Sequence, residues 1–340
     1  MDYNSMLKTA KENMEKCHVC PVCDGRACAG KVPGPGGKGS GSSAIRNYSW
    51  WREHVKIHMD VVTESFEPEI YTELFGCSLS MPILPAPIGM IALNFSDKLD
   101  EYTYAKAVIE GAAKAGTLAF TGGGAVDECY FDPIRAIEEL GVPAVPTLKP
   151  WRMELVEERI KFAEQKGATA IAMDIDSAGL PHSSASAEPM VAKSADDIKK
   201  MCSMTKLPFV VKGVMTAKSA RAAADAGAYA IVVSNHGGRV LDEGLATGEV
   251  LAEIKQVVGN RSKILIDGGI RTGADVYKAL ALGADVVLIG RPCAVAAFGG
   301  GAEGVKIYLE KIAAELKDVM KMTGTPTIKS INPETIKIIK

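Results

Sequence analysis

The sequence lacks a long apolar run, a strong net charge and an apolar leader segment. No stretch of about 18 uncharged apolar residues occurs, so no segment is predicted to span a bilayer. With 39 Lys and Arg against 41 Asp and Glu, the net charge is −2, which gives no electrostatic reason to bind nucleic acid or a membrane surface. Residues 1–16 are polar with helical spacing and lack the apolar core of a signal peptide. We therefore expect a cytoplasmic protein.

The remaining composition is that of a soluble globular protein, with 47% apolar and 24% charged residues. A chain of 340 residues can hold one large α/β barrel or two ordinary domains. Four of the eight cysteines, Cys77, Cys129, Cys202 and Cys293, are scattered. They are most simply small apolar residues in a reducing compartment.

The other four cysteines are clustered near the N-terminus. Their spacing is C-x2-C-x2-C-x4-C, formed by Cys17, Cys20, Cys23 and Cys28. Bacterial ferredoxins hold an iron–sulfur cluster with nearly this spacing, and four thiolates can also close a structural zinc site. The last interval is one residue longer than in the ferredoxin pattern, so free thiols or a redox disulfide stay open as alternatives.

Residues 30–43, GKVPGPGGKGSGSS, are rich in Gly, Ser and Pro, as in a linker or a mobile loop. A tether is the simpler interpretation, although such a loop beside an active site could act as a lid. We therefore divide the chain into an N-terminal helix, Cys-rich segment and linker over residues 1–44, and a second unit over residues 45–340.

From about residue 80, apolar strand candidates alternate with amphipathic stretches. The predicted strands are Ile83–Ile88, Leu118–Thr121, Ala144–Leu148, Ala170–Ile175, Phe209–Lys212, Ala230–Ser234, Ile264–Asp267 and Val286–Gly290. The amphipathic stretches between them include Leu155–Gln165, Ala217–Ala226 and Ala274–Leu282. Eight such units over roughly 240 residues favour a closed (β/α)8, or TIM, barrel.

In such a barrel the chemistry lies at the C-terminal ends of the strands. The segment AIVVSNHGGRVLD, residues 230–242, places His236 and Arg239 after a strand, with two glycines between them. Histidine exchanges protons near neutral pH, and arginine offers a planar fork for a carboxylate. An active site is one interpretation, and an ordinary strand-to-helix loop is the other.

The last two strands end in DGGIRTG and IGRP. Glycine turns, two arginines and a helix start near Thr272 offer backbone N–H groups and positive charge to an anion. Barrels often bind a phosphate after strands seven and eight. We therefore predict a phosphate site in this corner.

These motifs together resemble the FMN-dependent 2-hydroxy-acid oxidase and dehydrogenase family, which includes glycolate oxidase, lactate oxidase and mandelate dehydrogenase. The resemblance is carried by PAPIGM at 85–90, PFVVKGV at 208–214, VSNHGGRVLD at 233–242, DGGIRTGADVYKALALGAD at 267–285 and IGRP at 289–292. It covers about residues 45–335 and implies a flavoprotein that oxidises a 2-hydroxy acid to the 2-oxo acid.

The resemblance also implies a role for individual residues. His236 would be the base, Arg239 the carboxylate clamp, and Asp176 the partner of His236. Lys212 would stabilise the reduced flavin. The remaining flavin contacts would come from Pro87, Ile88, Gly89, Ser234, Asp267, Gly269, Arg271, Gly290 and Arg291.

Several positions depart from the family pattern. Thr147-Leu148-Lys149 stands where a substrate-binding Tyr is expected, Asp174 replaces a Thr, and no Arg follows Asp176 within residues 177–183. Lys149 or His182 could supply the missing group, but a solvated Lys149 and a His182 in a variable loop are the simpler expectation. Gly122–Gly124 could admit a bulkier substrate or make room for the Cys-rich segment.

The leading interpretation is an FMN-dependent 2-hydroxy-acid oxidoreductase that passes electrons to O2 or to another acceptor. It would take a small carboxylate of the lactate or glycolate kind, and the resemblance implies a homo-oligomer, commonly a homotetramer. An electron-transfer flavoprotein without hydroxy-acid chemistry is one alternative. A flavoenzyme with another substrate is a second, including an isomerase of the isopentenyl-diphosphate type.

Overall fold

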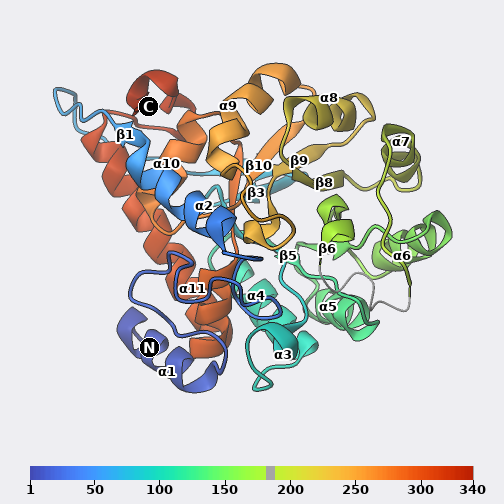
Figure 1. The fold of residues 1–340 in the computed structure, drawn as a ribbon. Helices are drawn as coiled ribbons and strands as arrows, with labels where there is room; N and C mark the ends of the chain where they lie inside the picture. The colour runs from blue at the N-terminus through green and yellow to red at the C-terminus, as the bar shows by residue number, and fades with distance from the viewer. Residues whose placement is uncertain (181–187, 340) are drawn as a thin grey trace.

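A parallel β-barrel forms the centre of the molecule, as the computed structural model shows for residues 1–180 and 188–339 (Figure 1). Its eight strands are β4 (Ile83–Pro85), β5 (Ala119–Thr121), β6 (Ala144–Leu148), β7 (Ile171–Asp174), β8 (Phe209–Val214), β9 (Ala230–Val233), β10 (Lys263–Ile266) and β11 (Val286–Ile289). The hydrogen-bonded order is β4-β11-β10-β9-β8-β7-β6-β5, and β4 and β5 at its two ends lie side by side. The predicted TIM barrel is confirmed, with each strand boundary within a few residues of its expected place.

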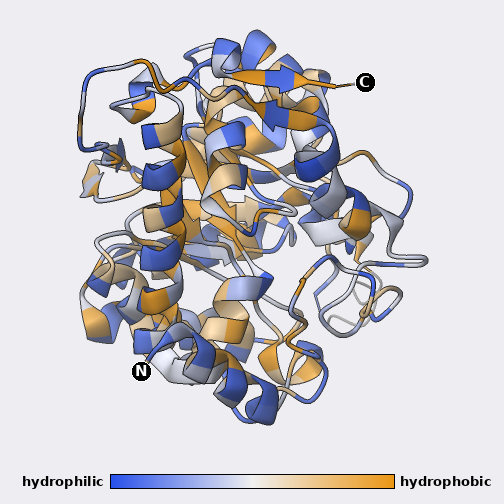
Figure 2. Ribbon diagram, turned by 90° about the vertical axis from the view of Figure 1, so that its left-hand side faces the viewer, coloured by the Kyte–Doolittle hydropathy of each residue, from blue (hydrophilic) through white to orange (hydrophobic). Residues whose placement is uncertain are grey.

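The strands are short apolar runs because both of their faces are buried, which is typical of parallel barrels. Figure 2 shows them as a hydrophobic centre among more polar helices. Side chains that point into the barrel form one core, which includes Leu84, Phe120, Val145, Ala172, Val210, Val232, Leu265 and Leu288. The larger core lies between the strands and the surrounding helices.

Eight helices follow the strands and cover the barrel. They are α4 (Glu101–Lys114), α5 (Glu128–Leu140), α6 (Met153–Gln165), α7 (Ala195–Ser203), α8 (Ala217–Asp225), α9 (Thr247–Val258), α10 (Gly273–Ala281) and α11 (Arg291–Met322). Capping boxes begin two of them: Ser194 with Asp197 at α7, and Thr272 with Asp275 at α10. No helix among the described residues combines the length and apolar content needed to cross a membrane.

The N-terminal segment lies against the barrel rather than apart from it. Helix α1 (Tyr3–Asn13) packs on α11, and α2 (Ser42–Glu53) packs near the end of β9 (Figure 1). Between them, residues 14–41 form no helix or strand. Two small sheets that the sequence did not predict pair β1 (Val55–Ile57) with β12 (Ile336–Ile338), and β2 (Thr72–Leu74) with β3 (Cys77–Leu79).

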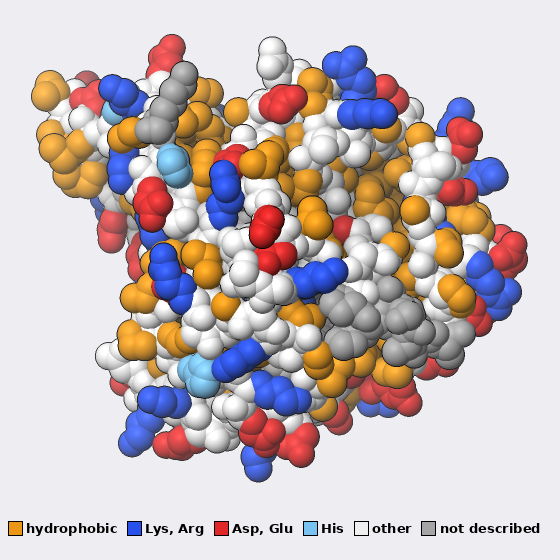
Figure 3. All heavy atoms as spheres, viewed as in Figure 1, with side chains coloured by type: hydrophobic (Ala, Val, Ile, Leu, Met, Phe, Trp, Pro, Cys, Tyr) orange, Lys and Arg blue, Asp and Glu red, His pale blue; other side chains and the backbone are white. Residues whose placement is uncertain are grey.

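The surface carries charges of both signs. On the face shown in Figure 3, Lys and Arg side chains are interspersed with Asp and Glu. No broad area of one sign covers this face, in agreement with the net charge of −2.

Candidate active site

A pocket opens at the C-terminal ends of the barrel strands, and every strand end contributes to its wall. The lining residues include Pro87–Met90, Gly122–Ala125, Lys149, Asp174, Lys212, His236, Gly237, Arg239, Asp267–Arg271, Gly290 and Arg291. Val32 and Pro35 of the N-terminal segment and Leu93–Phe95, beside the short helix α3 (Ile91–Asn94), complete it. This is where a TIM barrel places its chemistry.

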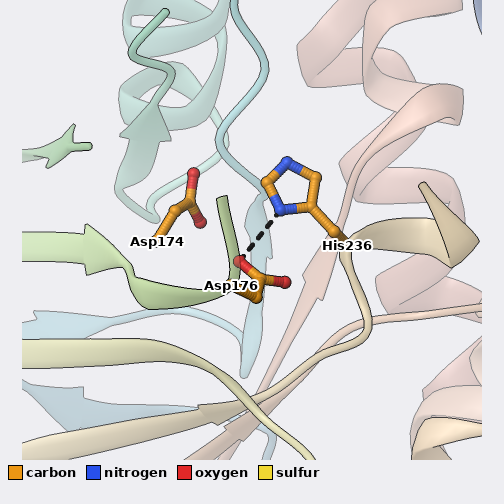
Figure 4. A group of neighbouring side chains, drawn as sticks. All are labelled: Asp174, Asp176 and His236. Carbon is orange, nitrogen blue, oxygen red and sulfur yellow. Dashed lines mark hydrogen bonds and ion pairs between the residues drawn. The ribbon is translucent and has the colours of Figure 1, made fainter. Parts of the chain in front are cut away.

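The His236 loop has a tightly constrained backbone. His236, Gly237 and Gly238 all adopt positive φ, at 58°, 65° and 80°. This conformation costs glycine little but is uncommon for histidine, which indicates that the surroundings hold the side chain in place. His236 Nδ1 lies 3.1 Å from Asp176 Oδ1, so the predicted His–Asp pair is brought together (Figure 4).

Asp176 can reach His236 because a glycine lies beneath it. Strand β8 has a bulge between Lys212 and Val214, and Gly213 in this bulge has a φ of 101°. A Cβ at Gly213 would lie 2.5 Å from Asp176 Cγ, so no larger residue fits without displacing the carboxylate. Gly213 is a positioning residue that sequence reasoning missed, although the glycine in PFVVKGV was a usable signal.

Two buried lysines share one aspartate beside the His–Asp pair. Asp174 Oδ2 lies 2.8 Å from Lys149 Nζ, and Asp174 Oδ1 lies 2.9 Å from Lys212 Nζ. Lys149 is only 4% exposed, so the expectation that it is solvated is wrong. The physical reason is its partner: the carboxylate at the end of β7 compensates the ammonium group, and Ser177 Oγ accepts a second hydrogen bond at 3.1 Å.

The charges of this cluster shift its ionisation strongly. Burial alone would raise the pKa of Asp174, but the ammonium groups of Lys149 and Lys212 outweigh it and hold that pKa well below its usual range. Burial alone would lower the pKa of Lys212, but Asp174 and Asp267 raise it. Asp267 differs, since burial raises the pKa of its carboxyl despite Lys212. Lys212 is therefore a fixed positive charge in the pocket wall.

The four residues predicted to hold the phosphate lie together at the ends of β10 and β11. Gly269, Arg271, Gly290 and Arg291 line one side of the pocket, and α11 begins there with Gly290 as its N-cap. The N-terminus of α11, with no side chain to cap it, offers a positive dipole end to an anion. Arg291 Nη1 donates a long hydrogen bond to the carbonyl of Pro35, at 3.4 Å.

Two buried polar atoms in this wall lack any hydrogen-bond partner among the described residues. They are Asp267 Oδ1 and Arg271 Nη2. Buried polar atoms are rarely left unpaired, so a ligand with hydroxyl and anionic groups is indicated. The ribityl chain and phosphate of FMN carry these groups, and the residues present therefore fit this cofactor. Ser234 does not line the pocket: its hydroxyl donates to Asp267 Oδ2 at 2.9 Å and accepts from His236 N at 3.1 Å.

Arg239 is held by the N-terminal segment. Its Nη1 donates to the carbonyls of Gly34 and Gly36, and its Nη2 donates to Asn94 Oδ1 at 2.8 Å. Burial, and then the charge of Arg291, lower the pKa of Arg239 to about 10. The Gly-rich residues 32–37 thus form part of the pocket wall. A position beside the active site was the less simple of the two interpretations of this segment, the other being a plain tether.

Helix α2 supplies a positioning residue that sequence reasoning missed. Asn47 and Asn235 exchange side-chain hydrogen bonds of 2.7 and 3.1 Å, and both side chains are buried. Asn47 Oδ1 also accepts from Thr247 N at 3.1 Å, while Asn235 Oδ1 accepts from Gly238 N at 3.2 Å. The pair ties the His236 loop to α2. No local pattern marked Asn47, because its partner lies 188 residues away.

The three glycines after β5 let neighbouring parts of the chain approach closely. A Cβ at Gly122 would lie 2.2 Å from Ile88 C, and one at Gly123 would lie 2.3 Å from Thr147 O. At Gly124, a Cβ would meet Cys129 at 2.7 Å. All three glycines also line the pocket, so room for a bulkier substrate or for the Cys-rich segment stays a prediction.

The four N-terminal cysteines are free and partly buried in the structure. A metal ion needs several ligand atoms close together. Within the described residues, only one group of three such atoms lies within 4.8 Å of one another, and it belongs to Asp174, Asp176 and His236. The carboxylates of this group are already bound to Lys149, Lys212 and His236. His182, the other residue considered for the substrate side, lies outside the described part of the chain.

Comparison with known proteins defines the class. The family model of the FMN-dependent dehydrogenases matches residues 35–191 and 180–338, so the chain belongs to this family of FMN-dependent oxidoreductases.

Among its relatives is a protein of Arabidopsis thaliana named peroxisomal (S)-2-hydroxyacid oxidase GLO3, which is 31% identical over 82% of this chain and 83% of its own. An L-lactate oxidase of Lactobacillus jensenii is 30% identical over 88% and 80%.

Solved structures agree with this assignment. A Pediococcus acidilactici protein assigned as a lactate oxidase superposes with a TM-score of 0.81 and 28% identity, over 100% of this chain and 95% of its own. A mandelate oxidase variant with an FMN monooxide adduct gives a TM-score of 0.74 and 30% identity, over 91% and 98%. The barrel and the cofactor class predicted from the sequence are therefore confirmed.

Proposed function

We propose that this protein oxidises a 2-hydroxy carboxylic acid to the 2-oxo acid, with His236 as the base and Arg239 as the carboxylate clamp. The observation that carries the proposal is the His236–Asp176 pair, which lies in the same pocket as Arg239 and the FMN-binding wall. FMN binding alone requires neither His236 nor Arg239. The relatives named as hydroxy-acid, lactate and mandelate oxidases support the same substrate class.

His236 would take the substrate's proton on Nε2. Its Nδ1 is engaged by Asp176 Oδ1 at 3.1 Å, which fixes the ring and leaves Nε2 for the substrate. Once the proton is taken, the Asp176 carboxylate stabilises the imidazolium that results. FMN, when bound, accepts the two electrons, and Lys212 supplies a fixed positive charge in the same wall.

Arg239 retains enough donors to bind a carboxylate. A guanidinium has five N–H groups. Three of those of Arg239 are used by Gly34, Gly36 and Asn94, which leaves two for the fork that matches a carboxylate. The same three contacts orient the guanidinium before the substrate arrives, which lowers the entropy lost on binding.

Lys149 would provide the second positive group on the substrate side. Its ammonium has three donors, of which Asp174 and Ser177 use two. The third remains for a substrate oxygen, because Lys149 lines the pocket. Lys149 would thus take the place of the missing arginine and tyrosine.

The electron acceptor depends on the Cys-rich segment. If its four thiolates hold an iron–sulfur cluster, the electrons would leave through it and the enzyme would be a dehydrogenase rather than an oxidase. With zinc, which carries no electrons, or with no metal, the flavin would pass its electrons directly to O2 or another acceptor. A homo-oligomer, a cytoplasmic location and the boundary between residues 44 and 45 stay predictions from the sequence.

An anaerobic titration tests the proposed function. The FMN-loaded protein is mixed with a panel of small L- and D-2-hydroxy acids, and the flavin absorbance and the 2-oxo acid formed are measured. We expect one stereoisomer of at least one acid to bleach the flavin and to yield one 2-oxo acid per flavin. A flavin that stays oxidised with every acid would contradict the proposal.

A further inference from the structure

A second cavity, separate from the substrate pocket, is lined by all four clustered cysteines. Its wall contains Cys17, Cys20, Cys23 and Cys28, together with residues of α1 and α11. Apolar and aromatic side chains close the rest, among them Tyr3, Met6, Leu7, Val19, Val22, Val295 and Tyr308. The fold thus gathers four partly buried cysteines around one cavity, which the spacing alone did not require.

The charged residues in this wall are mostly positive. Lys and Arg supply four, namely Arg52, Arg271, Arg291 and Lys311, whereas Asp24 is the only acidic residue among the lining residues described. Four cysteine thiolates with a metal centre carry a net negative charge. Arg52 and Lys311 are paired with Asp275 and Glu315, so Arg271 and Arg291 supply the positive charge that complements such a group.

The separation of the sulfurs distinguishes one ion from a cluster. With Zn–S bonds of about 2.3 Å, a tetrahedral zinc site places its sulfurs about 3.8 Å apart. In the described structure, no three of the four cysteine sulfurs lie within 4.8 Å of one another. A cubane cluster holds its thiolates farther apart, since each binds a different iron. The four sulfurs therefore lack the close approach that a preformed single-zinc site requires.

We infer that Cys17, Cys20, Cys23 and Cys28 hold a [4Fe–4S] cluster that carries electrons away from the flavin. The cluster site itself stands apart from the proposed function, whereas its reduction by a hydroxy acid rests on that function. The spacing C-x2-C-x2-C-x4-C supplies all four ligands from one segment.

The cavity adjoins the flavin site through shared residues. Pro35, Arg271 and Arg291 line both the Cys-rich cavity and the substrate pocket. Arg271 Nε donates to Cys23 O at 2.9 Å, so a residue of the predicted phosphate site bonds directly to the cysteine segment. Positive charge and hydrogen bonds near a cluster raise its reduction potential, which favours reduction by a hydroxy acid.

The electrons balance with one further acceptor. Oxidation of the hydroxy acid removes two electrons and two protons. The cluster takes one electron at a time, as its core passes from the 2+ to the 1+ state, so each substrate reduces it twice. A one-electron carrier protein of the iron–sulfur or haem class would take each electron, and the protons leave to solvent.

Metal analysis tests the site. Full-length protein is prepared without oxygen and reconstituted with ferrous iron and sulfide, and iron, acid-labile sulfide, zinc and FMN are measured per chain. We expect about four irons and four sulfides in the wild type. Cys20→Ser should lose most of this iron and keep its FMN, whereas the control Cys77→Ser, outside the segment, should lose neither. Zinc alone, no metal, or equal iron in Cys20→Ser would overturn the inference.

Electron paramagnetic resonance after anaerobic addition of a hydroxy acid tests the path. We expect flavin bleaching and a reduced-cluster signal in the wild type, and bleaching without that signal in Cys20→Ser. Bleaching of the wild type with no cluster signal would contradict electron transfer while the proposed oxidation stands. If iron is bound but no acid reduces the flavin, the proposed oxidation is contradicted, together with the electron path that depends on it. The cluster site would still stand.

Discussion

The two sides of the pocket are built by different means. The side formed by β8–β11 presents backbone turns, a helix N-terminus and arginines close in sequence to those turns, such as Arg271 and Arg291. The side formed by β5–β7 depends on one side-chain pair, Lys149 with Asp174, from neighbouring strands. On the first side, each turn and its arginine are neighbours in the sequence. On the second side, the two paired residues are far apart in the sequence and meet only when the chain folds.

This difference explains which side can be altered without losing the cofactor. Backbone N–H groups and glycine turns bind a phosphate whatever the substrate is. The substrate side can exchange one hydrogen-bonding set for another, provided that buried charges stay paired. Lys212 joins the two sides, because it contacts Asp174 on one and Asp267 on the other.

Removal of the Lys212 ammonium group should have the largest effect on stability. Lys212→Met leaves Asp174 and Asp267 with one cation fewer, so we expect the free energy of unfolding to fall by about 3–5 kcal/mol. The FMN content of the purified protein should fall as well. Urea unfolding and flavin absorbance measure the two effects.

Lys149→Met is the matched control on the substrate side. Asp174 keeps Lys212 in this variant, so we expect a smaller loss of about 1–3 kcal/mol, retained FMN and a raised KM. Equal losses of stability and of flavin in both variants would remove the distinction between the two sides.

Arg239→Met should lower kcat/KM by at least about 30-fold, because truncating one partner of a buried charge pair costs about 2–5 kcal/mol. Most of the change should appear in KM. Steady-state kinetics with the best hydroxy acid measures it, and Arg221→Met on the exposed face of α8 serves as the control. An unchanged KM would show that another group holds the carboxylate.

Asn47→Ala should act on kcat through the position of His236. Loss of the amide pair frees the His236 loop, and we expect kcat to fall on the order of 10- to 100-fold with little change in KM. Asn4→Ala, at an exposed site on α1, controls for the substitution itself. A rise in KM with kcat preserved would place Asn47 in substrate binding instead.

The smallest effect concerns Glu101, whose Oε1 accepts a hydrogen bond from Ile91 N at 2.6 Å just beyond the Pro87–Met90 loop. Burial raises the pKa of Glu101 to about 7. This pKa is higher in the folded than in the unfolded chain. The stability that Glu101 contributes is therefore fully present below pH 4 and is lost as the pH rises through 7.

Glu101→Gln should remove that pH dependence. We expect the variant to gain about 1–2 kcal/mol over the wild type at pH 8, a figure reduced for the partial exposure of the side chain. Urea unfolding at pH 5 and pH 8 compares the two proteins. A wild-type stability that is flat over this range would contradict the raised pKa.

The difference between the two sides also explains which features of the molecule could be predicted from the sequence. Short apolar runs that alternate with amphipathic stretches predicted the barrel, because this signal is local. The glycines and arginines after β10 and β11 are equally local, and the structure brings them to one wall of the pocket. Lys149 was expected to be solvated, since nothing near it in the sequence shows that Asp174, 25 residues on, compensates its charge. Asn47 and the role of Gly213 were missed for the same reason.

The most direct test of the account follows flavin reduction in a single anaerobic turnover, with wild type and His236→Ala both loaded with FMN. The account predicts that the wild type is bleached by the active hydroxy acid, and more slowly when C2 carries deuterium. His236→Ala should keep its flavin and be reduced about 100- to 10,000-fold more slowly. Reduction of His236→Ala at the wild-type rate would contradict the assignment of His236 as the base.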